Sequence, residues 1–457
     1  MKKVTDYKNK NVLVVGLGKS GTNSAYLLKE LGANVTVNDK NIPEDKSVLT
    51  ALENDQIKAV VGSHPLDLLD DCDLIVKNPG IPYTNSLIAE ALKRGIKIIT
   101  EPELAYEISE AGLVGVTGTN GKTTTTTMIS LMLDHLSKDG KAYACGNIGV
   151  SAISAAKKAT AKDTLVMELS SFQLMGITKL HPKIAVLTNI YEAHTDYHGS
   201  RENYIEAKMN ILKNQTETDY FVVNFDEEEW QKLSERSRAK VIPFSRKAVT
   251  KDGAYEQDGG LYFKEEPIIE ASNIKVPGTH NIENALAAIA VAKTMGVKND
   301  VIVEVLENFS GVRHRTQYVT TINGRKFYND SKATNMEATE KALAGFKTPV
   351  VLLAGGLDRG FTFERLVPYL KEHVNGLVVF GETKELLKDA GKKAGIAHIV
   401  EAKDAVDAVR KAYAISNVGD TILLSPACAS WDQWKTFEER GDKFIEEVEK
   451  LENEEKA

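Results

Sequence analysis

The chain has 457 residues, which is enough for about three domains of ordinary size, each with its own hydrophobic core. Its formal net charge of -7, without any long basic run, argues against binding to nucleic acid. The three cysteines match no metal-ligand spacing and no apolar run approaches the roughly 18 residues of a membrane span, so we expect a reduced cytoplasmic protein without membrane insertion.

Short β-branched runs alternate with amphipathic helical stretches, a pattern typical of parallel α/β sheets. Eight runs are predicted as strands: residues 12–15, 35–37, 74–76, 165–167, 184–187, 350–353, 377–379 and 422–424. Residues 226–240 are predicted as a charged helix and residues 251–267 as glycine-punctuated hairpins. We place domain boundaries to give residues 1–102, 103–311 and 312–457.

The first predicted strand is followed by Gly16, Gly18 and Gly21 in the G-x-G-x-x-G spacing, and Asp39 ends the next strand. Glycines at such a turn admit a diphosphate, and the acid can hold a ribose hydroxyl. The pattern fits a dinucleotide dehydrogenase, another nucleotide-diphosphate ligand, or a Rossmann-like turn kept for close packing. A second turn, over residues 78–82, can line the same crevice.

The second domain carries the run GTNGKTT between an apolar strand and a helical stretch. It comprises Gly118, Thr119, Asn120, Gly121, Lys122, Thr123 and Thr124. Backbone amides and the helix N-terminus suit phosphate oxygens, while Lys122 adds a charge and Thr123 offers a hydroxyl to Mg²⁺. The strict P-loop spacing requires glycine where Val116 stands. We predict a variant loop that binds a nucleoside triphosphate; the alternative is an ordinary glycine turn with a solvated lysine.

Two further strand ends in this domain carry polar candidates. Glu168 ends a predicted strand, where an acid commonly meets the metal of a bound nucleotide; otherwise it is a charge at a helix start. His194 follows another strand, together with Asp196 and His198.

Lys208 lies on the apolar side of a helix predicted over residues 202–213, beside Tyr204. Such a lysine usually extends its amine to solvent. If the amine is instead desolvated, its pKa falls, and the neutral amine can take up CO₂ to give a carbamate, an anionic metal ligand.

The remaining candidates lie towards the C-terminus. Asn281 and Asn284 share a face at the start of a predicted helix, where their amides either cap the helix or hold adenine and ribose. Arg315 precedes the run NDSKATN, which offers Asp330, Ser331, Lys332 and Thr334 to a phosphorylated ligand, although any polar turn has some such mixture. Arg359 follows two glycines and is well placed for a carboxylate.

Ser430 and Phe437 follow the last strand, and Trp431 is expected to pack rather than to stack on a ligand.

These motifs occur in an order that resembles the Mur ligases of peptidoglycan synthesis over essentially the whole chain. The matching elements are VGLGKSG, NPGIP, GTNGKTT, GNIG, ELSSFQL, the His194 segment, EAKMNIL, GTHNIENALAA, HRTQ, NDSKATN and SPACAS. NDSKATN with SPACAS is similar to the branch that adds D-glutamate, and the DNPR-type motif of the lysine- or diaminopimelate-adding branch is absent. Arg359 stands where some members have lysine, and HRTQ lacks an aromatic residue that often follows its arginine.

The resemblance implies a three-domain α/β fold: an N-terminal Rossmann-like domain, a central P-loop ATPase-like domain with a mostly parallel sheet, and a C-terminal Rossmann-like domain. It implies that ATP phosphorylates the carboxylate of UDP-N-acetylmuramoyl-L-alanine and that the amine of D-glutamate attacks the acyl phosphate. It also implies that the C-terminal domain closes over the others, giving open and closed forms, and we expect a monomer.

The same resemblance assigns roles to the candidates. The catalytic set is Lys122, Glu168, His194 and Lys208, with one Mg²⁺ near Thr123 and Glu168 and a second held by His194 and carbamylated Lys208. ATP contacts, beyond the glycine loop, are Asn281, Asn284, Arg315 and Asp330. D-glutamate contacts are Lys332, Thr334, Arg359, Ser430 and Phe437. UDP-sugar contacts are Gly18, Lys19, Ser20, Asp39 and Asn147.

Three rival classes stay open. A sister ligase, including a folylpolyglutamate-type ligase, would share the central domain but not VGLGKSG together with NDSKATN. An NAD-dependent dehydrogenase would leave Lys122 and Lys208 unexplained. A regulatory P-loop NTPase would hydrolyse ATP without an amino acid.

Overall fold

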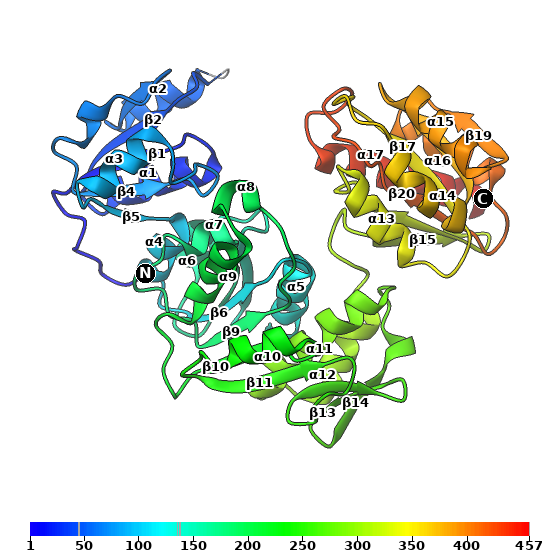
Figure 1. Cartoon of the computed structure of the whole chain (residues 1–457), viewed down its shortest axis with the longest axis horizontal. Coiled ribbons are helices and arrows are strands. Elements are labelled where there is room, and N and C mark those ends of the chain that lie inside the picture. The colour runs from blue at the N-terminus through cyan, green and yellow to red at the C-terminus, as the bar shows by residue number, and fades with distance from the viewer. Residues whose placement is uncertain (44–45, 135, 137–138, 457) are drawn as a thin grey trace. The chain divides into compact units, whose positions relative to one another are not determined.

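The computed structural model describes residues 1–43, 46–134, 136 and 139–456. Its strands form three separate sheets with helices packed beside them (Figure 1). All eight predicted strands are present, and the three-domain α/β class is confirmed. The chain divides into two compact units, residues 1–271 with 283–306, and residues 272–282 with 307–457, and the first unit contains two of the sheets.

The first sheet has five parallel strands in the order β3-β2-β1-β4-β5. Its strands are β1 (Asn11–Val15), β2 (Asn34–Asp39), β3 (Lys58–Val61), β4 (Leu74–Lys77) and β5 (Lys97–Ile99). Its helices are α1 (Lys19–Glu30), α2 (Ser47–Asn54), α3 (Ser86–Lys93) and α4 (Glu101–Ile108), with a 3₁₀ turn η1 (Leu66–Leu69). The strand order reverses between β1 and β4, so a crevice for a ligand is expected beyond the carboxyl ends of those two strands.

The second sheet has nine strands in the order β14-β13-β12-β11-β10-β9-β6-β8-β7. They are β6 (Gly112–Thr117), β7 (Ala142–Gly146), β8 (Thr164–Glu168), β9 (Ile184–Leu187), β10 (Tyr220–Asn224), β11 (Lys240–Ser245), β12 (Ala254–Gln257), β13 (Gly260–Phe263) and β14 (Glu266–Glu270). β6 to β12 pair in parallel, whereas β12, β13 and β14 form the antiparallel hairpins predicted over residues 251–267.

The helices of this region begin with α5 (Lys122–Leu133), which follows the glycine loop. The others are α6 (Ala152–Lys158), α7 (Ser171–Leu174), α8 (Thr195–His198), α9 (Arg201–Met209), α10 (Glu228–Ser234), α11 (Thr279–Thr294) and α12 (Asn299–Asn308), with 3₁₀ turns η2 (Asn210–Leu212) and η3 (Ala271–Asn273). The helix predicted over residues 202–213 thus ends in a 3₁₀ turn. The predicted helix over residues 226–240 is too long, because Ser237 accepts a hydrogen bond from the amide of Ala239 and β11 begins immediately afterwards.

The third sheet has six strands in the order β15-β16-β20-β17-β18-β19, all parallel except the β15–β16 hairpin. They are β15 (Gln317–Ile322), β16 (Arg325–Asn329), β17 (Val350–Gly355), β18 (Val374–Phe380), β19 (His398–Glu401) and β20 (Thr421–Leu424). The helices are α13 (Met336–Ala344), α14 (Val367–His373), α15 (Lys384–Ala394), α16 (Ala405–Ile415) and α17 (Phe437–Lys456), with a 3₁₀ turn η4 (Glu364–Leu366). β17 is buried along its whole length, as expected of a parallel strand covered on both faces.

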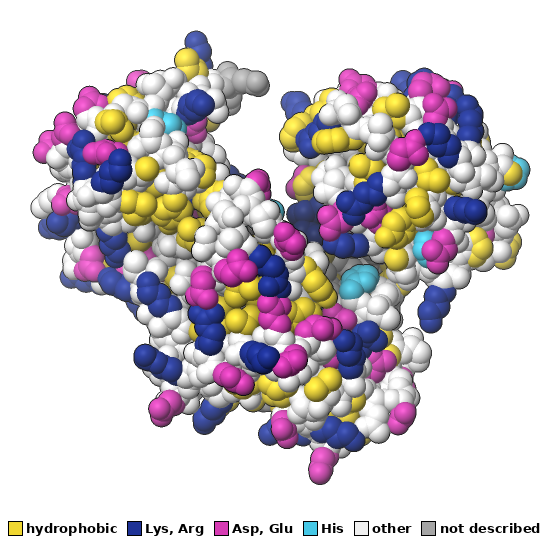
Figure 2. Space-filling model, viewed as in Figure 1, with side chains coloured by type: hydrophobic (Ala, Val, Ile, Leu, Met, Phe, Trp, Pro, Cys, Tyr) yellow, Lys and Arg dark blue, Asp and Glu magenta, His cyan; other side chains and the backbone are white. Residues whose placement is uncertain are grey.

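The described surface carries mixed charge. On the face drawn in Figure 2, basic and acidic side chains are interspersed rather than gathered by sign. In the part of the chain that the structure describes, no helix is both long and apolar enough to cross a bilayer. Cys72, Cys145 and Cys428 form no disulfide.

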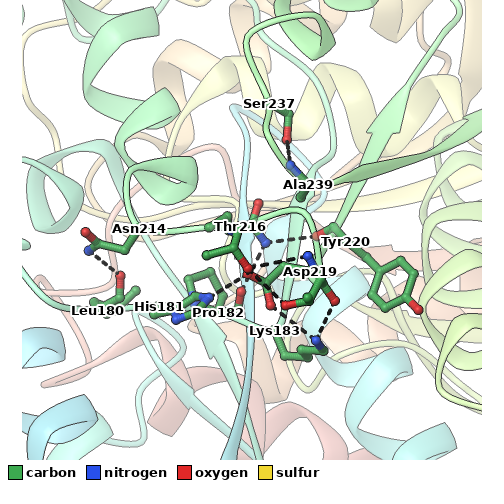
Figure 3. A network of polar contacts seen from close by, with 12 residues as sticks. Leu180, His181, Pro182, Lys183, Asn214, Thr216, Asp219, Tyr220, Ser237 and Ala239 are labelled. Atoms are coloured by element: carbon green, nitrogen blue, oxygen red, sulfur yellow. Dashed lines mark hydrogen bonds and ion pairs between the residues drawn. The ribbon is translucent and has the colours of Figure 1, made fainter.

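A buried acid network stabilises the amino end of β10 (Figure 3). The carboxylate of Asp219 lies 2.7 Å from Nε2 of His181 and accepts from the amide of Thr216, also at 2.7 Å. Burial acts to raise the pKa of Asp219, but the hydrogen bonds from His181 and Thr216 outweigh it and lower the pKa from 3.8 to about 2. Because β6, β9 and β10 are parallel, this network lies at the opposite sheet edge from the glycine loop.

The substitution Asp219→Asn is therefore expected to lower stability without changing turnover. A carboxylate with a depressed folded-state pKa stabilises the fold above its unfolded-state pKa, and this contribution is lost as pH falls from about 4 towards about 2. We expect a loss on the order of 2 kcal/mol at neutral pH, measured by urea unfolding. An unchanged urea midpoint at pH 7, or a deficit that persists undiminished in acid, would contradict this prediction.

Candidate active site

The glycine loop joins β6 to α5 and is fixed by the end of the neighbouring strand β9. Asn189 accepts from the amide of Asn120 through its side chain and from the amide of Thr119 through its carbonyl, both at 2.9 Å. Gly118 has φ +148°, and a Cβ there would lie 1.9 Å from the hydroxyl oxygen of Thr188. Gly118 thus allows the loop backbone to lie close to Thr188, and the loop amides lie at the N-terminus of α5. Thr188 and Asn189 were not predicted; two polar residues at a strand's carboxyl end were the available signal.

Lys122 and Thr123 begin α5 and lie at the same sheet edge as Glu168. The amine of Lys122 donates to the carbonyls of Gly118 and Thr119 at 3.0 and 2.8 Å. The hydroxyl of Thr123 donates to Glu168 at 2.7 Å. The charge of Lys122, the hydroxyl of Thr123 and the carboxylate of Glu168 therefore lie beside the glycine loop.

Sheet order explains why Glu168 and Asn147 meet. β8 lies between β6 and β7, so Glu168 pairs in register with Val116 on one side and Gly146 on the other. The amide of Asn147, just after β7, donates to Glu168 at 2.9 Å. Asn147 thus belongs to the carboxylate's immediate surroundings, and Glu168 is itself buried.

Lys208 is buried and points its amine at the glycine loop. The amine donates to the carbonyl of Gly118 at 2.7 Å and lies 4.5 Å from the ring centre of Tyr204. Only 1% of the side chain surface is exposed, so the alternative of an amine extended to solvent is wrong. Burial, followed by repulsion from Lys122, holds the pKa of Lys208 well below its ordinary value, against the attraction of Glu168.

His194 precedes α8 in a left-handed conformation, with φ 55°. Burial, followed by the charge of Lys208, lowers its pKa, which favours the neutral imidazole that metals bind. Its neighbour His198 is engaged elsewhere, because Nε2 of His198 lies 3.0 Å from the hydroxyl of Ser171. Across the described residues, no three His, Cys, Asp or Glu side chains are grouped as a metal site, so any metal here needs other donors as well.

The first sheet's glycine turn is tightly organised. Asp39 accepts from the amides of Leu17 and Asn41 at 2.7 and 2.9 Å. A Cβ at Gly21 would lie 1.9 Å from the carbonyl oxygen of Gly16, so this glycine is required for close packing. Gly18 precedes α1 in an extended conformation.

Two side chains of α1 contact segments from the central region. The amine of Lys19 donates to the carbonyl of Gly149 at 3.0 Å, and the hydroxyl of Ser20 donates to buried Glu101 at 3.2 Å. Glu101 also accepts from Ser151 at 2.6 Å. The glycine turn is therefore tied to the loop that carries Asn147.

The buried lysine Lys77 makes a second link between the first sheet and the central region. The amine of Lys77 donates to the carbonyl of Ile81 at 2.7 Å and to the hydroxyl of Tyr197, on α8, at 3.2 Å. Burial lowers the pKa of Lys77 to about 8. Neither residue was predicted, since an isolated Lys and Tyr carry no motif.

The two asparagines of α11 fall in different compact units. Asn284 accepts from the hydroxyl of Thr125 at 3.2 Å, and a Cβ at Gly121 would lie 2.1 Å from its side-chain oxygen. It therefore packs on the glycine loop. Asn281 donates to the carbonyl of Pro277 at 2.6 Å.

Asp330 follows β16 at the carboxyl edge of the third sheet. It accepts from the hydroxyl of Ser425, after β20, at 2.8 Å and from the amide of Thr316 at 3.0 Å. Burial raises its pKa to about 7 despite those hydrogen bonds and the charge of Arg315. Its carboxyl is thus held at the segment that begins with Arg315.

The residues predicted to receive an amino acid lie on loops of this domain, except Phe437, which begins α17. Lys332 lies over the ring of Phe437, with its amine 5.1 Å from the ring centre, and Thr334 donates its amide to the carbonyl of Lys332 at 2.8 Å. Within the described chain, the buried hydroxyl of Ser430 has no hydrogen-bond partner. Arg359 is exposed.

Arg440, on α17, was not predicted but joins these loops. It is fully buried and donates to the hydroxyl of Ser331 at 3.0 Å and to the carbonyl of Cys428 at 3.2 Å. The hydroxyl of Ser331 in turn donates to the carbonyl of Phe437 at 2.7 Å.

Three family models match successive parts of the chain. The model described as "Mur ligase MurD-like, N-terminal domain" matches residues 10–100, "Mur ligase middle domain" matches residues 116–292, and "Mur ligase, glutamate ligase domain" matches residues 314–428.

Curated relatives align over nearly the full length. The UDP-N-acetylmuramoylalanine–D-glutamate ligase of Ligilactobacillus salivarius is 69% identical over 99% of this chain and 98% of its own. The enzyme of the same name from Lactiplantibacillus plantarum is 60% identical with the same coverage.

Solved structures share the fold at low identity. UDP-N-acetylmuramate-alanine ligase from Thermotoga maritima superposes with a TM-score of 0.60 at 21% identity, covering 97% of this chain and 99% of its own. The MurF ligase from the same organism, in complex with ADP, gives a TM-score of 0.56 at 17% identity, covering 98% of both. At these identities the likeness bears on the fold alone.

Proposed function

Because the chain belongs to the Mur ligase family of ATP-dependent ligases in peptidoglycan synthesis, we propose that it joins D-glutamate to UDP-N-acetylmuramoyl-L-alanine. The near-complete alignment with two enzymes named for that reaction supports this choice over a sister ligase. The structural observation that carries the proposal is a pair of lysines at one glycine loop, Lys122, which is half-buried, and Lys208, which is buried. Neither a dehydrogenase nor a simple dinucleotide site requires such a pair.

The proposed reaction has two steps. The carboxylate of the alanyl substrate attacks the γ-phosphorus of ATP, which forms an acyl phosphate and releases ADP. The amine of D-glutamate then attacks the acyl carbon, inorganic phosphate leaves with the bonding electron pair, and the nitrogen releases one proton to solvent as the amide forms. Loop amides at the N-terminus of α5 and the charge of Lys122 stabilise the negative charge that is transferred in the first step.

We propose that Thr123 and Glu168 hold one Mg²⁺, and that His194 and Lys208, as its carbamate, hold a second. The donors fit: a hydroxyl and a carboxylate already meet at 2.7 Å, and hard oxygen ligands are those that Mg²⁺ prefers. When bound, the two ions would screen the phosphate and acyl phosphate charges. The buried amine of Lys208, beside a second lysine, is suited to react with CO₂ because its neutral form is favoured.

The substrate contacts are proposed from the resemblance to the Mur ligase family. Gly18, Lys19, Ser20, Asp39 and Asn147 are assigned to the UDP-sugar, and Asn281, Asn284, Arg315 and Asp330 to ATP. Lys332, Thr334, Arg359, Ser430 and Phe437 are assigned to D-glutamate. We retain domain limits of 1–102, 103–311 and 312–457, and we propose a monomer in the cytoplasm, where ATP and UDP-linked substrates are available.

The proposal is tested by phosphate release from ATP in the presence of UDP-N-acetylmuramoyl-L-alanine, with and without amino acid. We expect sustained release to require D-glutamate, and L-glutamate or L-lysine to support little. Equal release without any amino acid would indicate an NTPase, and equal release with L-lysine would indicate a sister ligase. Either result removes the assignment.

A further inference from the structure

An exposed tryptophan lies beneath the arginine assigned to D-glutamate. Trp431 follows β20, is 66% exposed, and its ring centre lies 5.0 Å from the guanidinium carbon of Arg359, in the loop after β17. The sequence predicted that Trp431 packs rather than stacks on a ligand, but most of its side chain is exposed. An indole this exposed contributes little to the hydrophobic core. Its contact is with the guanidinium of Arg359, at a distance typical of a cation–π interaction.

The two loops are fixed against each other by their backbones. Gly355 donates to the carbonyl of Pro426, and Leu357 donates to the carbonyl of Ala429, both at 2.9 Å. Gly356 has φ +149°, and a Cβ there would lie 2.2 Å from the carbonyl oxygen of Ala429. The two loop backbones are therefore joined by hydrogen bonds that do not involve the side chain of Trp431.

The guanidinium has no acidic partner among the described residues. Its acidic neighbours are engaged: Glu382 accepts from the amide of Asp358 at 3.0 Å, and Asp358 accepts from the amide of Gly360 at 2.8 Å. Stacking occupies the flat face of a guanidinium and leaves its N–H edge available to a carboxylate.

A second observation points to a ligand at the same place. Ser430 immediately precedes Trp431, is 1% exposed, and its hydroxyl has no hydrogen-bond partner within the described chain. A buried hydroxyl without a partner costs free energy unless a ligand completes it. Ser430 thus offers a buried hydroxyl, and the next residue, Trp431, offers an exposed aromatic ring to the side chain of Arg359.

We propose that Trp431 is a positioning residue for the amino-acid substrate: its indole holds the guanidinium of Arg359 so that the N–H edge receives a carboxylate of D-glutamate. The inference rests on the proposed function and deepens it. An arginine stacks on an aromatic ring more effectively than a lysine, so the indole accounts for an arginine where some family members have lysine.

The test compares Trp431→Ala, Trp431→Leu and Trp431→Phe in the full-length enzyme with wild type. We expect the alanine and leucine variants to raise KM for D-glutamate about two- to fivefold, the range of an exposed cation–π contact, with kcat and KM for ATP unchanged. The phenylalanine variant should stay closer to wild type, because it keeps an aromatic face. Because the side chain is exposed, folding should be unaffected, and thermal unfolding checks this.

A matched control lies at the opposite edge of the same sheet, where Arg325 lies 4.9 Å from the ring centre of Tyr413. Tyr413→Ala removes this contact together with a hydrogen bond from Asn323 and a ring contact with Phe327, and it should still leave KM for D-glutamate unchanged. In an Arg359→Lys background, Trp431→Ala should have a smaller effect than in wild type. The inference is overturned if Trp431→Leu matches wild type, if KM for ATP rises equally, or if the effects of Trp431→Ala and Arg359→Lys simply add. Loss of D-glutamate dependence in wild type would instead count against the proposed function.

Discussion

Replacing Lys208 with alanine is expected to lower the ligation rate about a thousandfold, the scale of losing a buried group that stabilises transition-state charge. The amine lies 2.7 Å from the carbonyl of Gly118, next to the loop assigned to the phosphates. If the working form is a carbamate, the variant lacks an anionic metal ligand. Small carboxylates such as formate or acetate should then restore part of the rate, measured as D-glutamate-dependent phosphate release.

Lys208→Arg distinguishes a carbamate at this position from a simple positive charge. Arginine keeps the cation but does not form a carbamate under these conditions, so the variant should be as slow as alanine. Full activity in Lys208→Ala would end the catalytic role of this residue. Activity in Lys208→Arg close to wild type would end the carbamate proposal while leaving a role for the charge.

The substitution Lys122→Met is expected to lower kcat by a similar factor, about a hundred- to a thousandfold, through a different cause. Methionine keeps the length of the side chain but removes the charge that is proposed to face the transferred phosphoryl group. Because the loop amides that are proposed to bind the phosphates remain, KM for ATP should rise much less than kcat falls. Single-turnover measurement of ADP formation isolates this step from the attack by D-glutamate.

Lys232→Met is a matched control, because Lys232 is an exposed helical lysine paired with Glu228. It should retain wild-type rates. If Lys122→Met raised KM for ATP strongly and left kcat intact, Lys122 would contribute to binding alone, and the proposed stabilisation of the transferred charge would be wrong.

Much of the fold was predictable because buried parallel strands appear in the sequence as short apolar runs. Val350, for example, begins a fully buried strand whose neighbours are also apolar. The helix over residues 226–240 was overextended because charge pattern alone does not reveal where serine hydroxyls replace helical hydrogen bonds.

The glycine loop was predictable from local spacing, whereas the contacts that hold its neighbouring side chains in place were not. Contacts of Glu168 with Asn147 depend on β8 lying between β6 and β7, which no local pattern reveals. Burial of Lys208 depends on how α9 packs, so the sequence left its solvent-exposed alternative open. Trp431 shows the reverse error, since a large aromatic residue favours the interior on average but here lies on the surface.

In the proposed reaction, ATP activates the substrate's carboxylate as an acyl phosphate. The most direct measurement uses UDP-N-acetylmuramoyl-L-alanine whose carboxylate carries a heavy oxygen isotope, followed by mass analysis of the released inorganic phosphate. With both carboxylate oxygens labelled, phosphate formed with D-glutamate should contain one labelled oxygen, because the leaving phosphate keeps the bridging oxygen of the acyl phosphate. Release of unlabelled phosphate during amide formation would contradict the proposed reaction.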